Sequence, residues 1–157
     1  MNKNLKIILS TILLGFVAVS IAFAVFNETK KENPTETKKL SPTSKHQYIA
    51  YYFHGNARCQ SCFKIESYTA ETIKTKFASE LNDSKLLWQV VNIEEMANEH
   101  FIKEYSLSTK SVVLSEVNEG KEVKWKNLDK IWNLLNDQLQ FSTYIENEVR
   151  NFLTASK

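Results

Sequence analysis

The sequence is poor in cysteine, proline and glycine: its 157 residues include two cysteines, two prolines and three glycines. Domains that depend on structural disulfides usually carry several cysteines at wide spacing. Here the two cysteines, Cys59 and Cys62, lie three positions apart. Closing so short a loop constrains the unfolded chain little. We therefore interpret the pair as a site of chemistry and not as a structural disulfide.

The sequence also lacks an excess of charge of one sign, since its formal net charge is +2. Of the 20 Lys and Arg, Lys3 and Lys6 lie at the start of an apolar run, which leaves 18 against 18 Asp and Glu. This balance forces no face to be basic, so we expect no nucleic-acid partner. The three glycines form no phosphate-binding fingerprint for a flavin or nicotinamide, and we expect no cofactor.

An apolar run occupies residues 5–26. A helix needs about 20 apolar residues to cross a bilayer, so residues 1–26 are predicted to be a signal anchor or a signal peptide. Ala22-Phe23-Ala24 fits a cleavage site, whereas the length of the run favours retention. We expect a single-pass protein of the cell membrane whose C-terminal domain lies outside the cytoplasm. Cleavage near Ala24 would instead release a secreted or periplasmic protein.

Residues 27–45 have a different composition, rich in Lys, Glu, Thr and Ser, and they contain both prolines. Such a segment cannot bury enough apolar surface to fold, so we predict a flexible polar linker. Residues 46–157 are then the folded part, which is room for one domain.

The folded part alternates between strand and helix patterns. Aromatic and β-branched runs that end at turn residues predict strands at 46–53, 86–93, 111–117 and 121–126. Apolar residues recurring every four positions predict a helix that follows the cysteines and reaches Leu81, and a second helix over 94–105 with Ala97 facing inward.

The C-terminal segment is also helical, but its apolar pattern changes phase. Leu128, Trp132, Leu135 and Leu139 define one stripe, and Phe141, Ile145, Val149 and Phe152 define another. A straight helix would not keep both stripes buried on one side, so we predict a break near Asn136-Asp137 and two helices. The resulting order, β-α-β-α-β-β-α-α, predicts an α/β fold with a parallel first β-α-β unit and an antiparallel hairpin.

These features resemble the thioredoxin-like superfamily. The resemblance is carried by four segments: the strand at 48–53, the Cys59-Gln60-Ser61-Cys62 pair that opens a helix, the strand end at 91–94, and residues 105–114 with the Gly120 hairpin. It covers residues 46–153 and implies a thioredoxin-like fold with an extra C-terminal helix. More narrowly, residues 52–59 and 125–132 resemble a small bacterial family labelled nitrophenyl compound nitroreductase subunit.

The chemistry of the pair follows from the ionisation of cysteine, because the thiolate and not the thiol attacks a disulfide. The start of a helix favours negative charge, and Arg58 adds a positive charge beside the first cysteine. We assign Cys59 as the exposed attacking thiol and Cys62 as the resolving thiol. The preceding strand lacks the buried acid of many thioredoxins, and His54 is the candidate for tuning the thiols in its place.

The loop that faces a substrate is expected to combine Gln60 and Ser61 with Lys110 and Ser111. Many superfamily members carry a cis-proline before the third strand, and Ser111 takes that position here. A non-proline cis bond costs about 3–4 kcal/mol, so we expect a trans bond at this point.

Three functions remain open at this stage. The first is an enzyme, a membrane-tethered thiol–disulfide oxidoreductase acting on a protein disulfide or dithiol. The second is a dedicated redox or binding subunit of a partner complex, which the missing proline and the extra helix favour. The third is a metal module, which would need both cysteines and two of His46, His54 and His100. No zinc-binding His-x3–5-His pattern is present, so we expect no metal.

Overall fold

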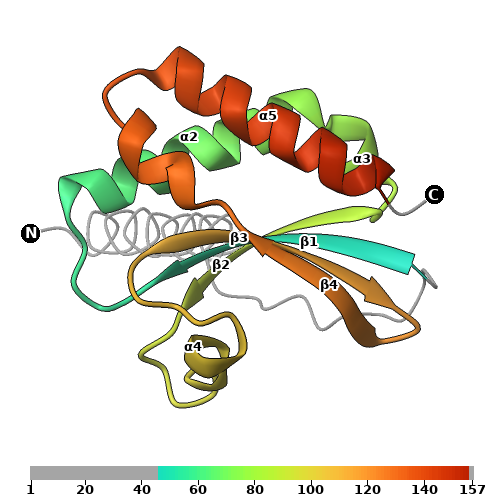
Figure 1. Ribbon diagram of the computed structural model, residues 1–157, viewed down its shortest axis with the longest axis horizontal. Coiled ribbons are helices and arrows are strands. Elements are labelled where there is room, and N and C mark those ends of the chain that lie inside the picture. Colours follow the sequence, from blue (N-terminus) through green and yellow to red (C-terminus); the bar gives the residue numbers. More distant parts are fainter. Residues whose placement is uncertain (1–45, 156–157) are drawn as a thin grey trace, which may run out of the picture. The chain divides into compact units, whose positions relative to one another are not determined.

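The computed structural model describes residues 46–155, which form a mixed α/β domain (Figure 1). The elements in chain order are β1 (His46–His54), α2 (Gln60–Lys76), α3 (Ala78–Asn82), β2 (Leu86–Asn92), α4 (His100–Glu104), β3 (Ser111–Asn118), β4 (Lys121–Asn127), the 3-10 helix η1 (Asp129–Leu134) and α5 (Gln138–Thr154). Among these residues, no helix has the length and apolar character to span a membrane. The predictions for residues 1–26 and 27–45 lie outside the described residues.

The four strands form one sheet in the order β2-β1-β3-β4. β1 runs parallel to β2, with Tyr52 opposite Val90, and antiparallel to β3, with Tyr52 opposite Val112. β3 and β4 form the predicted antiparallel hairpin, with an irregularity between Glu116 and Val117. This order and these directions, with a helix connecting the parallel pair, are those of a thioredoxin-like fold.

Both faces of the sheet are covered, which explains why β1 is apolar and buried from Tyr48 to Phe53. Alternate residues of a strand point to opposite faces. Tyr48, Ala50 and Tyr52 belong to the larger core, and Tyr51 and Phe53 to the smaller one. α2 and α5 cover one face of the sheet and α4 lies on the other (Figure 1). The paired cysteines start the helix that packs on the larger core.

The predicted helix over 94–105 is wrong for most of its length, because only His100–Glu104 is helical. The Asn92 side chain accepts a hydrogen bond from the Glu94 N–H group (3.1 Å), and the Asn98 side chain donates one to the Asn92 carbonyl (2.9 Å). Side chains that bond to the nearby backbone in this way compete with helix formation. Ala97 is accordingly exposed and does not face inward.

The first helix is also interrupted, since α2 ends at Lys76 and α3 begins at Ala78. Phe77 joins them with a backbone that is not helical (φ −128°, ψ 32°) and buries its ring in the larger core. Phe77 is buried and Leu81 packs against the same core, so the predicted apolar stripe continues through this bend.

The predicted break in the C-terminal segment is confirmed between η1 and α5. Asp137 begins α5 by accepting a hydrogen bond from the Gln140 N–H group (3.0 Å). The second apolar stripe of the prediction, from Phe141 to Phe152, is buried. Leu139 does not belong to the buried stripe, because it lies in the first turn of α5 and is 77% exposed.

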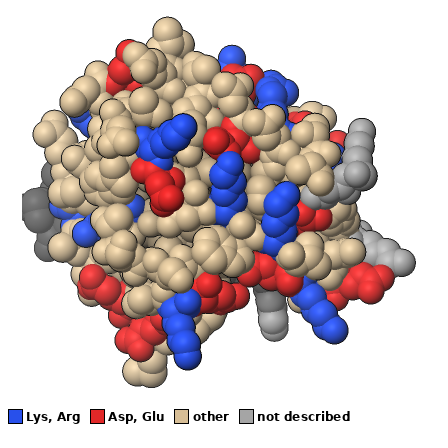
Figure 2. Space-filling model, in the orientation of Figure 1, with Lys and Arg blue, Asp and Glu red and all other residues tan. Residues whose placement is uncertain are grey.

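On the face shown in Figure 2, Lys and Arg lie beside Asp and Glu, and neither sign gathers into one patch. The pair formed by Arg150 and Glu146 on α5 is an example, with 2.8 Å between Nη2 and Oε1.

Candidate active site

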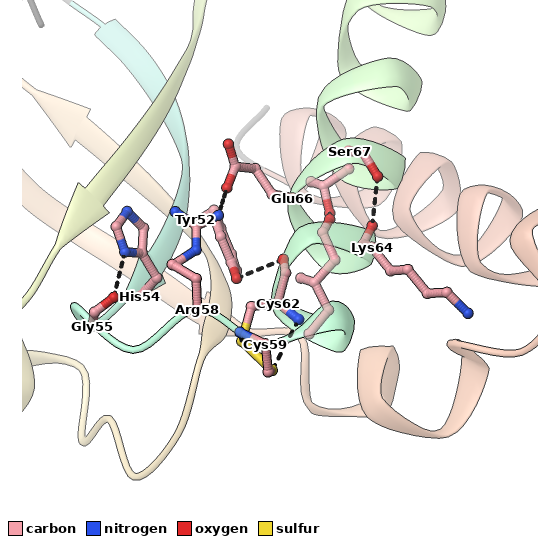
Figure 3. A network of polar contacts seen from close by, with 11 residues as sticks. Tyr52, His54, Gly55, Arg58, Cys59, Cys62, Lys64, Glu66 and Ser67 are labelled. Atoms are coloured by element: carbon pink, nitrogen blue, oxygen red, sulfur yellow. Dashed lines mark hydrogen bonds and ion pairs between the residues drawn. A yellow bond between two sulfur atoms is a disulfide. The ribbon is translucent and has the colours of Figure 1, made fainter. Parts of the chain in front are cut away.

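The loop of residues 55–59 carries the chain from the end of β1 to the start of α2 (Figure 3). It is held against the end of β2, because the Asn92 side-chain amide donates a hydrogen bond to Asn56 Oδ1 (2.7 Å). Gly55 is buried, and the Glu94 carboxylate lies directly over its Cα atom. The parallel pairing of β1 and β2 therefore places the loop that leads to the cysteines.

Cys59 and Cys62 form a disulfide at the start of α2, with 5.0 Å between their Cα atoms. Cys59 is the N-cap residue of the helix. Its sulfur accepts the Cys62 N–H group (3.3 Å), and the Cys62 sulfur accepts the Cys59 N–H group (3.0 Å). The sulfur atoms thus occupy the place where unpaired N–H groups and the helix dipole favour negative charge.

The two sulfur-bearing residues differ in access to solvent. Cys59 is exposed, whereas Cys62 is completely buried. A protein partner is able to reach the first residue and not the second. This difference suits the predicted division between an attacking and a resolving thiol.

Tyr52 of β1 contacts the backbone of the buried cysteine. The sequence analysis did not single it out as a site residue. Its hydroxyl donates a 2.8 Å hydrogen bond to the Cys62 carbonyl, and its side chain is fully buried (Figure 3). Burial raises the pKa of Tyr52 to about 12; Glu66 also raises it, and Arg58 opposes the shift. The hydroxyl therefore keeps its proton at neutral pH and remains a donor.

Arg58 precedes the disulfide, but its guanidinium group turns toward α2. Its Nη2 atom pairs with Glu66 Oε2 (Figure 3). Its Cζ atom lies 4.7 Å from the centre of the Phe63 ring and 5.9 Å from that of Tyr52. The Nε atom is buried and has no hydrogen-bond partner among the described residues. The charge proposed to favour the Cys59 thiolate is thus engaged by a carboxylate that sequence analysis did not consider.

His54 is the last residue of β1 and lies on the same side of the sheet as Tyr52, with 5.8 Å between the ring centres. Its Nδ1 atom lies 2.9 Å from the Gly55 carbonyl oxygen, and since a carbonyl only accepts, Nδ1 carries the proton. This bond leaves Nε2 as the nitrogen available to other groups. The role of His54 in tuning the thiols stays a prediction.

The residues predicted to face a substrate come from the first turn of α2 and from the segment at the start of β3. Gln60 is exposed and Ser61 half-buried in the first turn of α2. Ser111 opens β3 opposite Phe53 and is buried, with its hydroxyl donating to the Thr109 carbonyl (2.9 Å). The Lys110 carbonyl accepts a hydrogen bond from Trp132 Nε1 (3.1 Å).

The peptide bond before Ser111 is trans, as expected, since residues 46–155 contain no cis bond. Beside this loop lies a pocket of about 180 Å³. It is lined by mixed polar and apolar side chains from the segments on either side of the β3–β4 hairpin: Ser108, Thr109, Ser111, Asn127, Leu128, Asp129, Ile131 and Trp132.

The histidines considered for a metal site do not gather at the cysteines. His46 starts β1 and pairs with Glu116 (2.6 Å), at the opposite end of the strand from His54. His100 pairs with Glu104 at 3.8 Å on α4. Within residues 46–155, no three His, Cys, Asp or Glu side chains are arranged to hold a metal ion.

No family model and no curated protein matches the sequence. The solved structures that match include thioredoxins. Thioredoxin from Fasciola hepatica is 17% identical, with 71% of this chain and 82% of that chain covered and a TM-score of 0.40. Oxidised thioredoxin from Plasmodium falciparum is 19% identical (57% and 79% covered, TM-score 0.36). Thioredoxin O2 from Arabidopsis thaliana, also oxidised, is 18% identical (61% and 76% covered, TM-score 0.37).

At these identities and TM-scores the likeness assigns no function. The thioredoxin-like fold follows from the strand order and directions given above. The family labelled nitrophenyl compound nitroreductase subunit stays a resemblance in sequence.

Proposed function

We propose that this chain is a thiol–disulfide oxidoreductase that exchanges electrons with protein partners through the Cys59/Cys62 couple. The observation that carries the proposal is the asymmetric disulfide at the start of α2, with one exposed and one buried cysteine. A purely structural disulfide across three positions would constrain the chain little. An exposed disulfide at a helix N-terminus is instead suited to thiol exchange.

In the reducing direction the dithiol form reacts in two steps. The Cys59 thiolate attacks one sulfur of a partner disulfide, which forms a mixed disulfide and releases the other partner sulfur as a thiolate. Cys62 loses its proton and attacks the Cys59 sulfur, which restores the intramolecular disulfide and releases the second partner thiolate. Two electrons pass to the partner, whose thiolates take up two protons, and the reverse sequence oxidises a partner dithiol.

The surroundings of the couple support these steps. The N-terminal N–H groups of α2 stabilise a Cys59 thiolate, because that residue occupies the N-cap. The Tyr52 hydroxyl donates a hydrogen bond to the Cys62 carbonyl and so attaches the first turn of α2 to β1. This attachment restrains the backbone that carries the buried cysteine. The loop 108–111 supplies the neighbouring surface on which a partner segment would lie.

The function is tested by equilibrating the purified full-length chain with mixtures of reduced and oxidised glutathione, trapping thiols by alkylation, and measuring metal content in the same samples. A reversible two-electron couple between about −270 and −120 mV is expected, the range of this class of protein. The Cys62→Ser variant should accumulate a mixed disulfide at Cys59, whereas Cys59→Ser should not. A disulfide that does not form reversibly, or stoichiometric bound metal, would overturn the proposal.

A dedicated redox subunit is the second candidate, and one observation favours it. Ser111 stands where many thioredoxins carry a cis-proline, and its hydroxyl bonds to its own loop. The surface beside the cysteines therefore differs from that of a general reductase. Assays with several unrelated protein disulfides separate the two: a general oxidoreductase turns over most of them, and a dedicated subunit is nearly inert without its partner.

We further propose that residues 1–26 tether the domain to the membrane and that the domain lies outside the cytoplasm. The support is the length of the apolar run and the polar segment that follows it. Cell fractionation with a membrane-impermeant thiol reagent tests both points. Labelling of Cys59 in intact cells, after reduction, is expected in the membrane fraction; labelling only after lysis would contradict the orientation.

A further inference from the structure

Arg58 is adjacent to the attacking cysteine in sequence, yet its guanidinium hydrogen bond goes to Glu66 and to neither sulfur atom (Figure 3). Glu66 lies on α2, one turn beyond Cys62. The loop before the helix brings the two residues together across eight positions. The position of the Arg58 charge relative to Cys59 therefore depends on a residue of the helix.

The pair is partly shielded from water, with 23% of the Arg58 side chain and 31% of the Glu66 side chain exposed. The Phe63 ring at 4.7 Å adds a second contact with the guanidinium group. An ion pair in such surroundings is screened less than one in free solution. Arg58 is thus confined on the side of the loop that faces Tyr52 and Phe63.

We propose that Glu66 is a positioning residue that restrains Arg58 and thereby sets the acidity of the Cys59 thiol and the redox equilibrium of the couple. The proposal rests on the proposed oxidoreductase function. While the pair is closed, the Arg58 charge is compensated by a carboxylate and held toward α2. Without Glu66, the guanidinium is free to approach a Cys59 thiolate and stabilise it. A stabilised thiolate stabilises the dithiol form, so the couple becomes more oxidising.

Other titratable groups lie on the elements that surround the disulfide. They are Tyr52 and His54 from β1, Lys64 from α2 and Lys110 from the loop before β3. All of them are unchanged in the variants below, so differences between variants report on Arg58 and Glu66.

The test uses four full-length variants: Glu66→Gln, Arg58→Met, the double variant, and Glu146→Gln as a control. Glu146 forms ion pairs with Arg150 on α5 and with Lys76 at the last residue of α2, the opposite end of that helix from the disulfide. For each, the pH profile of Cys59 alkylation gives the thiol pKa, and equilibration with glutathione gives the equilibrium constant. Unfolding midpoints confirm that each variant is folded, and Glu66→Ala serves if Glu66→Gln is not.

Glu66→Gln should lower the pKa of Cys59 by about one unit, as expected for a cation brought near a thiolate. It should shift the glutathione equilibrium toward the dithiol by up to about tenfold, which equals about 30 mV. The shift should shrink at high salt, because the freed charge is screened. Arg58→Met should raise the pKa, and adding Glu66→Gln to Arg58→Met should change it little, since there is no guanidinium left to release.

Two results would overturn the proposal. One is a Glu66→Gln variant whose pKa and equilibrium match the wild type or the Glu146→Gln control. The other is an equal effect of Glu66→Gln with and without Arg58, which would mean that Glu66 acts directly on the thiol. Failure of the wild-type couple to cycle reversibly would instead overturn the oxidoreductase function itself.

Discussion

Replacing Tyr52 with Phe tests a fully buried polar contact of the candidate active site. The substitution removes the hydroxyl that donates a 2.8 Å hydrogen bond to the Cys62 carbonyl, and it leaves the ring in place. A buried hydrogen bond contributes about 0.5–1.5 kcal/mol net. The Cys62 carbonyl is inside α2 and keeps its helical partner, so the cost should lie within this range and not above it.

The same strand offers a matched control in Tyr48. It faces the same core, and its hydroxyl lies 3.5 Å from the Leu153 carbonyl, at the limit of a hydrogen bond and far along the strand from the disulfide. Tyr48→Phe should therefore cost less than Tyr52→Phe. Urea unfolding of the oxidised proteins measures both, with equal slopes required for a valid comparison.

Tyr52→Phe should also affect the couple, because the first turn of α2 loses its attachment to β1. We expect a faster exchange between Cys59 and glutathione and an unchanged rate in Tyr48→Phe. The reasoning is refuted if Tyr52→Phe is no less stable than Tyr48→Phe, or if both variants exchange at the wild-type rate.

Three further outcomes are expected. Asp137→Ala removes the N-cap of α5 and should cost about 1 kcal/mol in thermal or urea unfolding, whereas exposed Asp129→Ala, whose side chain makes no such bond, should cost less. Phe141→Ala empties a fully buried site in the larger core and should cost about 3–5 kcal/mol, against nearly nothing for exposed Leu139→Ala. Burial raises the pKa of Tyr51 and of Tyr52 to about 12 from 10.0, so the folded state holds these protons more tightly than the unfolded state. This contribution to stability should be complete below pH 10 and decline as the pH rises toward 12, with the ionisation of both residues following unfolding; ionisation of Tyr51 and Tyr52 themselves near pH 10 in the folded protein would contradict this.

The strands and the C-terminal break could be predicted because their signals are local. β1 is an unbroken run of apolar and aromatic residues from Tyr48 to Phe53, as expected for a central strand covered on both faces. The change of apolar phase near Asp137 follows from the helical period, and the structure ends η1 and begins α5 on either side of it.

The prediction of a helix over 94–105 was wrong because the structure of this segment depends on side-chain hydrogen bonds. The spacing of apolar residues carries no information about such bonds. Asn92 and Asn98 bond to nearby backbone groups and hold residues 94–99 in turns. Each of these side-chain hydrogen bonds contributes about as much free energy as one hydrogen bond of a helix. They therefore compete with helix formation, and helix propensity alone did not determine the conformation of the segment.

The sequence by itself determined the reactive pair, because a spacing of three between Cys59 and Cys62 allows a disulfide within one turn of a helix. It also determined that a strand precedes the pair and a helix follows it. Only the tertiary structure decided which polar groups surround the sulfur atoms. Tyr52 reaches Cys62 from the neighbouring layer, and Glu66 reaches Arg58 because the loop folds back over the helix start. Electrostatic effects depend on distance in space, which the order of residues along a chain does not specify.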